Sequence, residues 1–279
     1  MARALFEGAT IGFIGAGAMA TAMISGLLNR DIVDATHIIA SDPHAEKGEK
    51  LKQAYGIRFT MDNLEVAKHS DVLVLAVKPQ VLGRVLTPLR GRVDGVSLIV
   101  SIVASVKMRT IVGQLLNSRV VRSMPNTPAQ IGEGMTVWCA TDEVEQKQRE
   151  QAASLLGALG EQLYVDDERL LDMATALSGS GPAYVFLFME AMVDAGVRMG
   201  FTHRDASKLV LQTLKGSIHY GLDALESGVH LAQLRNQVTS PGGTTAAALY
   251  ELEKLGFRTA VAEGIWAAYQ RAMALGADE

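Results

Sequence analysis

A glycine motif directly after a short apolar run constrains the fold of this chain more than any other feature. The run Ile11–Ile14 leads into Gly15-Ala16-Gly17, and Ala20 completes the spacing G-x-G-x-x-A. In such motifs the first glycine makes the turn from strand to helix, and the second lets a pyrophosphate approach the backbone. The third small residue lets the helix pack on its strand. The motif therefore predicts a strand-helix-strand unit that binds a dinucleotide.

The end of the next apolar run predicts how the cofactor's ribose is recognised. Residues 37–40 form this run, and Ser41-Asp42 follow it, about 20 residues beyond the glycine motif, where an acidic residue commonly binds the ribose 2′-hydroxyl. Asp42 is the residue type that favours NADH and repels the extra phosphate of NADPH. Ser41, Asn63, His44 and Lys47 are residue types that bind that phosphate. Asp42 would need only to turn outward to leave the phosphate of NADPH undisturbed.

Short apolar runs continue to alternate with helix-forming stretches as far as Asp166-Asp167. Strands that alternate with helices predict an α/β fold with a doubly wound sheet, whose ligands bind at the carboxyl ends of the strands. Beyond this point helices dominate. We therefore expect a Rossmann-type domain over residues 1–166 and an all-helical domain over residues 167–279. The further predicted strands are residues 71–77, 98–102, 120–124, 134–140 and 161–165.

The first long helix of the second domain is apolar on nearly every face. Over residues 183–199 only Glu190, Asp194 and Arg198 interrupt the apolar surface. A helix that is apolar all round is buried, and so small a domain has little interior to bury it. We therefore expect this helix to lie in a subunit interface. Its strongly apolar part, residues 183–189, is too short to span a bilayer.

Charge and cysteine content narrow the range of partners. The formal net charge is −4, so we expect no nucleic-acid partner and no binding to an anionic membrane. Cys139 is the single cysteine and lies in an apolar run, which predicts a core residue in a cytoplasmic protein. The N-terminus has no apolar segment of the kind found in signal peptides, and no metal-ligand spacing is evident.

A second glycine turn, Ser240-Pro241-Gly242-Gly243-Thr244-Thr245, precedes another helix-forming segment. Adjacent glycines leave backbone amides uncovered, and amides at a helix N-terminus bind anions. The alternative is a Pro-Gly turn whose threonines only cap the helix. The dinucleotide motif in the same chain favours the anion site.

Five segments occur together in this chain: residues 13–17, 76–79, 124–129, 177–186 and 240–245. Together they resemble pyrroline-5-carboxylate reductase, the last enzyme of proline synthesis, over nearly the whole chain. The last two segments together are highly specific to that family. The chain departs from the family at residues 230–236, where His-Leu-Ala-Gln-Leu-Arg-Asn replaces His-Pro followed by Leu-Lys-Asp. It also departs at residues 102–105, where a glycine is usual.

The resemblance implies reduction of the C=N bond of 1-pyrroline-5-carboxylate to L-proline, with hydride from NADPH, or from NADH as the alternative. It also implies a homodimer that assembles further into a decamer. The implied cofactor-binding residues are Ile14, Gly15, Ala16, Gly17, Ala18, Met19, Ser41, Asn63, Ala76, Val77, Lys78, Pro79, Ile102, Val103 and Ala104.

The second glycine turn supplies the candidate substrate site. The amides of Gly243, Thr244 and Thr245, with the Ser240 hydroxyl, would bind the substrate carboxylate. Thr245 is the candidate catalytic residue, because its hydroxyl would also donate to the ring nitrogen. A threonine hydroxyl is too weakly acidic to protonate an imine, so the proton would come from solvent or from a substrate that is already protonated.

Two other functions fit parts of the sequence. A β-hydroxyacid dehydrogenase would share the first domain, but it needs a lysine on the first long helix of the second. Residues 173–197 contain no lysine. A non-catalytic dinucleotide sensor would need the glycine motif but not the turn at residues 240–245.

Overall fold

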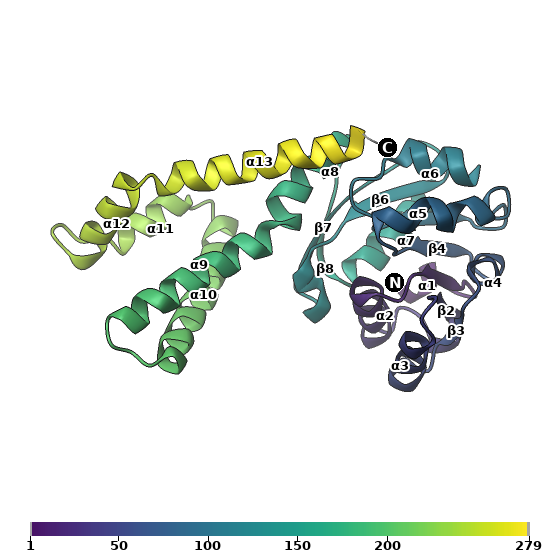
Figure 1. The fold of residues 1–279 in the computed structure, drawn as a ribbon, viewed down its shortest axis with the longest axis horizontal. Coiled ribbons are helices and arrows are strands. Elements are labelled where there is room, and N and C mark those ends of the chain that lie inside the picture. The colour runs from purple at the N-terminus through teal and green to yellow at the C-terminus, as the bar shows by residue number, and fades with distance from the viewer. Residues whose placement is uncertain (1, 278–279) are drawn as a thin grey trace. The chain divides into compact units, whose positions relative to one another are not determined.

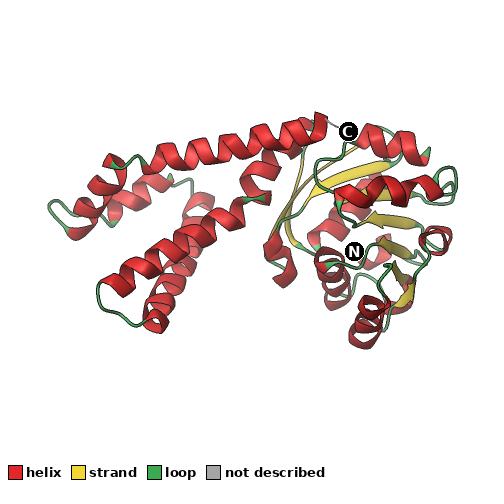
Figure 2. Ribbon diagram, in the orientation of Figure 1, coloured by secondary structure: helices red, strands yellow, loops and turns green. Residues whose placement is uncertain are grey.

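The computed structural model describes residues 2–277, which form two compact units (Figure 1). The first unit runs from the N-terminus through Pro182 and includes the segment from Ala268 onward, whereas the second is Ala183–Ala267. The first unit carries the sheet, and the second consists of helices and the loops between them (Figure 2).

An eight-stranded sheet forms the centre of the first unit, in the order β3-β2-β1-β4-β5-β6-β7-β8. Neighbouring strands are parallel except for the antiparallel pair β6 and β7. The predicted α/β class is therefore confirmed. The strands are β1 (Ile11–Ile14), β2 (Ile38–Ser41), β3 (Arg58–Thr60), β4 (Val72–Leu75), β5 (Leu98–Ser101), β6 (Val120–Met124), β7 (Gly134–Ala140) and β8 (Gly160–Tyr164).

Alternate residues of the central strands face opposite layers of helices, as a doubly wound sheet requires. Ile11 and Phe13 share one buried cluster with residues of α2 and α7. Leu73 and Leu75 share another with residues of α4, α5 and α6. The helices of this unit are α1 (Ala2–Leu5), α2 (Ala18–Asn29), α3 (Ala45–Tyr55), α4 (Asn63–Lys68), α5 (Pro79–Leu86), α6 (Met108–Leu115), α7 (Gln146–Gly157) and α8 (Arg169–Ala174).

The second unit has a small core of its own and a large exposed apolar surface. Its buried centre includes Val193 on α9 and Val210 on α10. Phe186 and Leu187, in contrast, are 59% and 66% exposed in the single chain. The predicted apolar helix is therefore present, and apolar side chains such as Phe186 and Leu187 are uncovered. The helices are α9 (Gly181–Arg198), α10 (His203–Glu226), α11 (Leu231–Gln237), α12 (Thr244–Lys254) and α13 (Phe257–Ala277), with the ends of α9 and α13 reaching into the first unit.

Helical backbone runs from α8 through a π-helical turn, Thr175–Gly179, into α9. By length and composition this stretch, Arg169–Arg198, is long and apolar enough to cross a membrane, with a mean hydropathy of 1.2 over 18 residues. The expectation considered residues 183–189 alone, which are too short, whereas the continuous helical stretch is longer. One such helix is weak support for a membrane span, since core helices of soluble proteins pass the same test.

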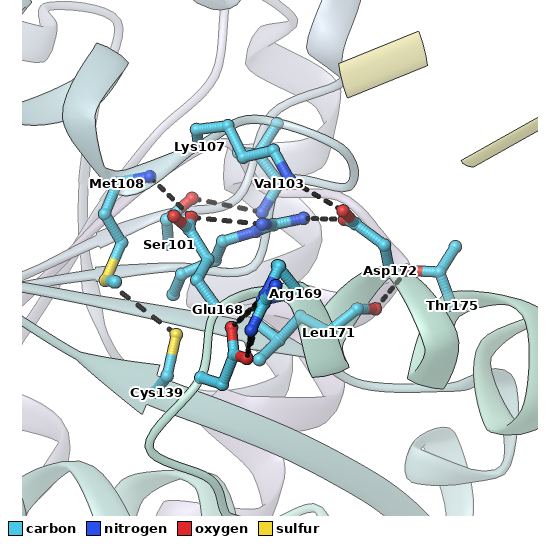
Figure 3. Close-up of polar contacts among 12 residues, drawn as sticks. Ser101, Val103, Lys107, Met108, Cys139, Glu168, Arg169, Leu171, Asp172 and Thr175 are labelled. Atoms are coloured by element: carbon cyan, nitrogen blue, oxygen red, sulfur yellow. Dashed lines mark hydrogen bonds and ion pairs between the residues drawn. The ribbon is translucent and has the colours of Figure 1, made fainter. Parts of the chain in front are cut away.

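A buried ion-pair cluster fastens α8 to the sheet (Figure 3). Arg122 on β6 is 2% exposed. Its Nη1 lies 3.0 Å from Oε1 of Glu168, and its Nη2 lies 2.8 Å from Oδ1 of Asp172. Lys107 Nζ lies 2.6 Å from the other carboxylate oxygen of Asp172. Because these pairs hold the segment after residue 166 against the sheet, the first compact unit extends through Pro182.

Candidate functional site

The turn between β1 and α2 has a shape that only glycine permits. Gly15 has φ of +102°, and a Cβ atom there would lie 2.4 Å from the carbonyl oxygen of Ala76. The Gly15 amide donates to the Ser41 carbonyl at 2.8 Å, and the Ala76 amide donates to the Ile14 carbonyl at the same distance. These bonds join the carboxyl ends of β1, β2 and β4, where the strand order reverses and ligands of such sheets bind.

Gly17 opens the start of α2 to a ligand. It is the N-cap residue, and no side chain caps the helix there. A Cβ atom on Gly17 would meet nothing within 4 Å. The first amides of a helix have no intrahelical acceptor, and they favour an anion. The residues present therefore fit the pyrophosphate of a dinucleotide.

A cavity of about 490 Å³ lies beside this turn. It brings together eight of the residues expected to bind cofactor: Ile14, Gly15, Gly17, Ser41, Asn63, Ala76, Val77 and Lys78. Seven others are outside its lining: Ala16, Ala18, Met19, Pro79, Ile102, Val103 and Ala104. The structure adds Asp42, Pro43, His44, Lys47, Met61, Val81, Arg84 and Val85.

Ser41 and Asn63 meet at one end of this cavity. The Ser41 hydroxyl donates to Oδ1 of Asn63 at 2.7 Å, which joins the end of β2 to the start of α4. Ser41 is fully buried, so its position is fixed by the sheet. The two positions expected near the adenosine ribose are therefore in contact.

Asp42 is turned inward in the structure, not outward. It is 6% exposed. Its Oδ2 accepts from the Ala16 amide at 3.1 Å and lies 2.9 Å from Lys47 Nζ. Its Oδ1 accepts from the amide and Nδ1 of His44 at 3.1 and 2.8 Å. Burial raises the pKa of Asp42, but the hydrogen bonds from Lys47, His44 and Ala16 together hold it below its ordinary value.

The cavity carries an excess of positive charge. Lys47, Lys78 and Arg84 line it, and the one carboxylate in the lining, Asp42, is paired with Lys47. A cleft with a surplus of cations attracts a polyanionic ligand. Sequence reasoning missed Arg84. The available signal was the Lys-Pro helix start at residues 78–79, which places residue 84 one and a half turns along α5.

The second glycine turn has the form expected of an anion site, with one change. Gly242 has φ of +68°, and Gly243, not a threonine, is the N-cap of α12, without a side-chain cap. The Gly243 amide donates to the Ser240 carbonyl at 3.1 Å, so the expectation that it is free for a ligand is wrong. Thr244 and Thr245 lie in the first helical turn, where amides have no intrahelical acceptor.

Two of the segments that carry the family resemblance contact each other. Asn126 donates from Nδ2 to the Ser178 carbonyl at 3.0 Å and accepts from the Met135 amide at 2.9 Å. A Cβ atom on Gly179 would lie 2.7 Å from the terminal methyl of Met124. Residues 124–126 and 178–179 are therefore in contact, which sequence spacing alone could not show.

Neither a reactive thiol nor a metal cluster is found in the described part of the chain. Cys139 is buried, and burial, with the nearby Glu168 carboxylate, raises the pKa of its thiol to about 12. It is therefore a core residue, as expected. Among residues 2–277 no group of three or more His, Cys, Asp or Glu side chains could hold a metal ion.

Comparison with known proteins covers both halves of the chain. The family described as pyrroline-5-carboxylate reductase dimerisation matches residues 168–275. The family described as NADP oxidoreductase, coenzyme F420-dependent, matches residues 10–105. Pyrroline-5-carboxylate reductases from Pseudomonas aeruginosa and Synechocystis are 44% and 42% identical, with 95% of this chain and 96% and 98% of those proteins covered.

Two solved structures show the same likeness in three dimensions. The pyrroline-5-carboxylate reductase of Coxiella burnetii superposes with a TM-score of 0.88 at 36% identity, over 96% of this chain and 98% of that one. The Plasmodium falciparum enzyme, solved with NADP bound, superposes with a TM-score of 0.86 at 32% identity, over 97% and 99% of the two chains.

Proposed function

The chain belongs to the pyrroline-5-carboxylate reductase family, and we infer from this that it reduces 1-pyrroline-5-carboxylate to L-proline, the last step of proline biosynthesis. It is an NAD(P)H-dependent oxidoreductase that acts on a C=N bond. The observation that supports this function most strongly is the near-complete match, at more than 40% identity, to two reductases. The cationic cavity beside Gly15 and Gly17 supports the use of a dinucleotide.

The direct test is a spectrophotometric assay of reduced nicotinamide. We expect its absorbance to fall only when the protein, 1-pyrroline-5-carboxylate and reduced cofactor are all present. A β-hydroxyacid dehydrogenase would instead reduce the oxidised cofactor in the presence of a β-hydroxyacid. A dinucleotide sensor would bind the cofactor and leave the absorbance constant.

We propose that the loop from Ile14 to Met19 binds the pyrophosphate, with Ser41 and Asn63 near the adenosine ribose. Residues 76–79 and 102–104 line the nicotinamide side. The bound cofactor supplies the hydride. The chain's own contribution at this site is to orient the dinucleotide and to neutralise its charge through Lys78 and Arg84, which line the cavity.

Substrate binding is assigned to the second glycine turn. We propose that the first-turn amides of Thr244 and Thr245, with the Ser240 hydroxyl, bind the substrate carboxylate. Gly243 contributes space, because a Cβ atom there would lie 2.3 Å from the Ser240 hydroxyl oxygen. The Thr245 hydroxyl donates to the ring nitrogen and orients it, while the proton comes from solvent or from a substrate that is already protonated.

The two proposed domains have different roles. We propose that residues 1–166 bind the dinucleotide and that residues 167–279 bind substrate and form the dimer. The family match that begins at residue 168 supports this boundary. The ion pairs from Arg122 to Glu168 and Asp172 explain why the start of the second domain packs with the first. We further propose that the enzyme works in the cytoplasm, as the single buried thiol suggests.

The exposed apolar surface of α9 predicts the oligomeric state. Side chains such as Phe186 and Leu187 are more than half exposed in the single chain, and covering them removes apolar area from water. The dimerisation match includes all of α9. We propose a helix-swapped or helix-interlocked dimer as the smallest unit and a decamer as the final state, so sedimentation at micromolar concentration should show a dimer or a larger assembly. A monodisperse monomer would refute this.

Cofactor preference is the second prediction that arises here. We expect both reduced cofactors to work, with a moderate preference for NADPH, because cationic side chains line the same cavity as Ser41 and Asn63. The measurement is kcat/KM for each cofactor at a saturating concentration of 1-pyrroline-5-carboxylate. A clearly higher value with NADH would reverse this ordering.

A further inference from the structure

We propose that Lys47 sets the cofactor preference of this enzyme by holding the Asp42 carboxylate against the glycine loop, an inference that rests on the dinucleotide site proposed above. In this position the carboxylate can neither accept a hydrogen bond from the ribose 2′-hydroxyl of NADH nor repel the 2′-phosphate of NADPH. Asp42 therefore occupies the position of a residue that recognises the ribose, but its role is to stabilise the glycine loop.

The first support is the number of donors that Asp42 already accepts. An ionised carboxylate has about four lone-pair sites on its two oxygens. Oδ2 is bonded by the Ala16 amide and Lys47, and Oδ1 is bonded twice by His44. An ionised carboxylate only accepts, so Nδ1 of His44 must carry the hydrogen. All four sites are filled, and a ribose hydroxyl would have to displace a donor.

The second support is that the positive charge of Lys47 compensates the negative charge of Asp42. Lys47 Nζ lies 2.9 Å from Asp42 Oδ2, and the Asp42 side chain is 6% exposed. A pair this close, with one partner buried, has little net charge seen from the cavity. The remaining side chains that are always charged in the lining, Lys78 and Arg84, are cations. An additional phosphate in the cavity therefore meets no uncompensated negative charge from the lining side chains.

The third support is where the carboxylate is anchored. Ala16 lies between the two glycines of the dinucleotide motif, and its amide donates to Asp42 at 3.1 Å. That bond ties the end of β2 to the turn that binds the pyrophosphate. A carboxylate that moved out to reach a ribose would leave the buried Ala16 amide without its acceptor, which is costly.

A simpler alternative is that Lys47 contacts the 2′-phosphate directly. Both readings predict that Lys47→Gln weakens NADP⁺ binding, so a double-mutant cycle is needed to separate them. If the loss comes from an exposed Asp42 charge, adding Asp42→Asn removes that charge and restores the affinity. If the loss comes from a missing contact to phosphate, the second substitution restores nothing.

The experiment measures the Kd of NADP⁺ and NAD⁺ by titration calorimetry on the intact protein, without substrate. We expect wild type to bind NADP⁺ more tightly than NAD⁺. In Lys47→Gln the Kd for NADP⁺ should rise about tenfold, with the Kd for NAD⁺ changed less than about twofold. In the double variant the Kd for NADP⁺ should return to within about threefold of wild type.

Three controls complete the test. Lys50→Gln removes a lysine from the exposed side of the same helix, α3, and should leave both Kd values unchanged. Lys47→Arg keeps the pair with Asp42 and should keep the preference. Asp42→Asn alone leaves the Lys47 charge unpaired, so it should bind NADP⁺ at least as tightly relative to NAD⁺ as wild type does. Melting temperatures show whether each variant is folded.

Two results would overturn the role assigned to Lys47. One is a double variant as weak for NADP⁺ as Lys47→Gln alone. The other is a selective loss of NAD⁺ affinity in Asp42→Asn, which would mean that Asp42 reads the ribose after all. Either result leaves the reductase activity untouched, because that activity is tested by wild-type turnover of 1-pyrroline-5-carboxylate and not by cofactor binding.

Discussion

Replacing Thr245 with alanine should lower kcat by about 10²- to 10³-fold, while cofactor binding stays close to that of wild type. Alanine keeps the backbone amide in the first turn of α12 and so keeps the proposed contact to the substrate carboxylate. It removes the hydroxyl that we propose donates to the ring nitrogen as hydride arrives. One preorganised donor of this kind contributes about 2–4 kcal/mol to transition-state stabilisation. The measurement is steady-state kcat and KM together with cofactor Kd.

Two matched variants separate catalysis from stability. Thr245→Ser keeps the hydroxyl and should recover most of the lost kcat. Thr239→Ala removes a hydroxyl from the same turn, but that hydroxyl donates to the Arg235 carbonyl at 2.7 Å, so its loss should lower stability and leave kcat near normal. A Thr245→Ala enzyme with a lower melting temperature and near-normal kcat would mean that Thr245 only supports the helix start.

The second large effect is expected at the buried ion-pair cluster. Arg122→Ala should destabilise the protein by about 3–5 kcal/mol, because it leaves Glu168 and the buried Asp172 without their shared cation. Lys107 remains on Asp172 but contacts only one of its oxygens. The measurement is urea unfolding at a fixed protein concentration, since oligomerisation contributes to apparent stability.

Arg169→Ala is the control for this substitution. Arg169 pairs with Asp167 at 2.7 Å, and its side chain is 83% exposed. An exposed pair of this kind contributes little, so the urea midpoint should stay close to that of wild type. If Arg122→Ala is no more damaging than Arg169→Ala, the buried cluster does not hold α8 to the sheet.

The central strands were predictable because each is a continuous apolar run that ends at a recognisable turn. Their residues are buried on both faces of the sheet, and the glycine motif fixes which strand comes first. The edge strand β3 was missed because Arg58-Phe59-Thr60 is too short and too polar to show a period. The strand is held in the sheet by its parallel pairing with β2, which the sequence of β3 does not indicate.

The sequence predicted the backbone turn of the candidate site, but it did not predict the contacts of the side chains around that turn. Gly15 is required because a Cβ atom there would clash with the Ala76 carbonyl, whereas Gly17 leaves open space for a ligand, and the motif predicts a glycine at both positions. The inward orientation of the Asp42 side chain depends on its contacts with Lys47 and His44. The sequence alone does not show whether Lys47 and His44 contact Asp42 or a ligand. The Gly243 amide was assigned to a ligand, although the turn itself uses it.

Contacts between distant segments were outside the reach of the sequence. Arg122 looks like an ordinary polar residue within a strand, and nothing nearby in the chain indicates that its partners are Glu168 and Asp172. The same holds for Asn126 and Ser178. A single sequence shows local periodicity and motifs, whereas pairs of this kind are set by how the layers pack.

The most direct measurement of the central claim follows the hydride. Wild-type enzyme is incubated with 1-pyrroline-5-carboxylate and NADPH that carries deuterium at carbon 4 of the nicotinamide, in separate reactions for the two faces of the ring. Mass spectrometry and NMR then identify the product. We predict L-proline with a single deuterium at carbon 5, from one of the two labelled cofactors only. The absence of proline, or proline formed without deuterium from either cofactor, would contradict the assignment.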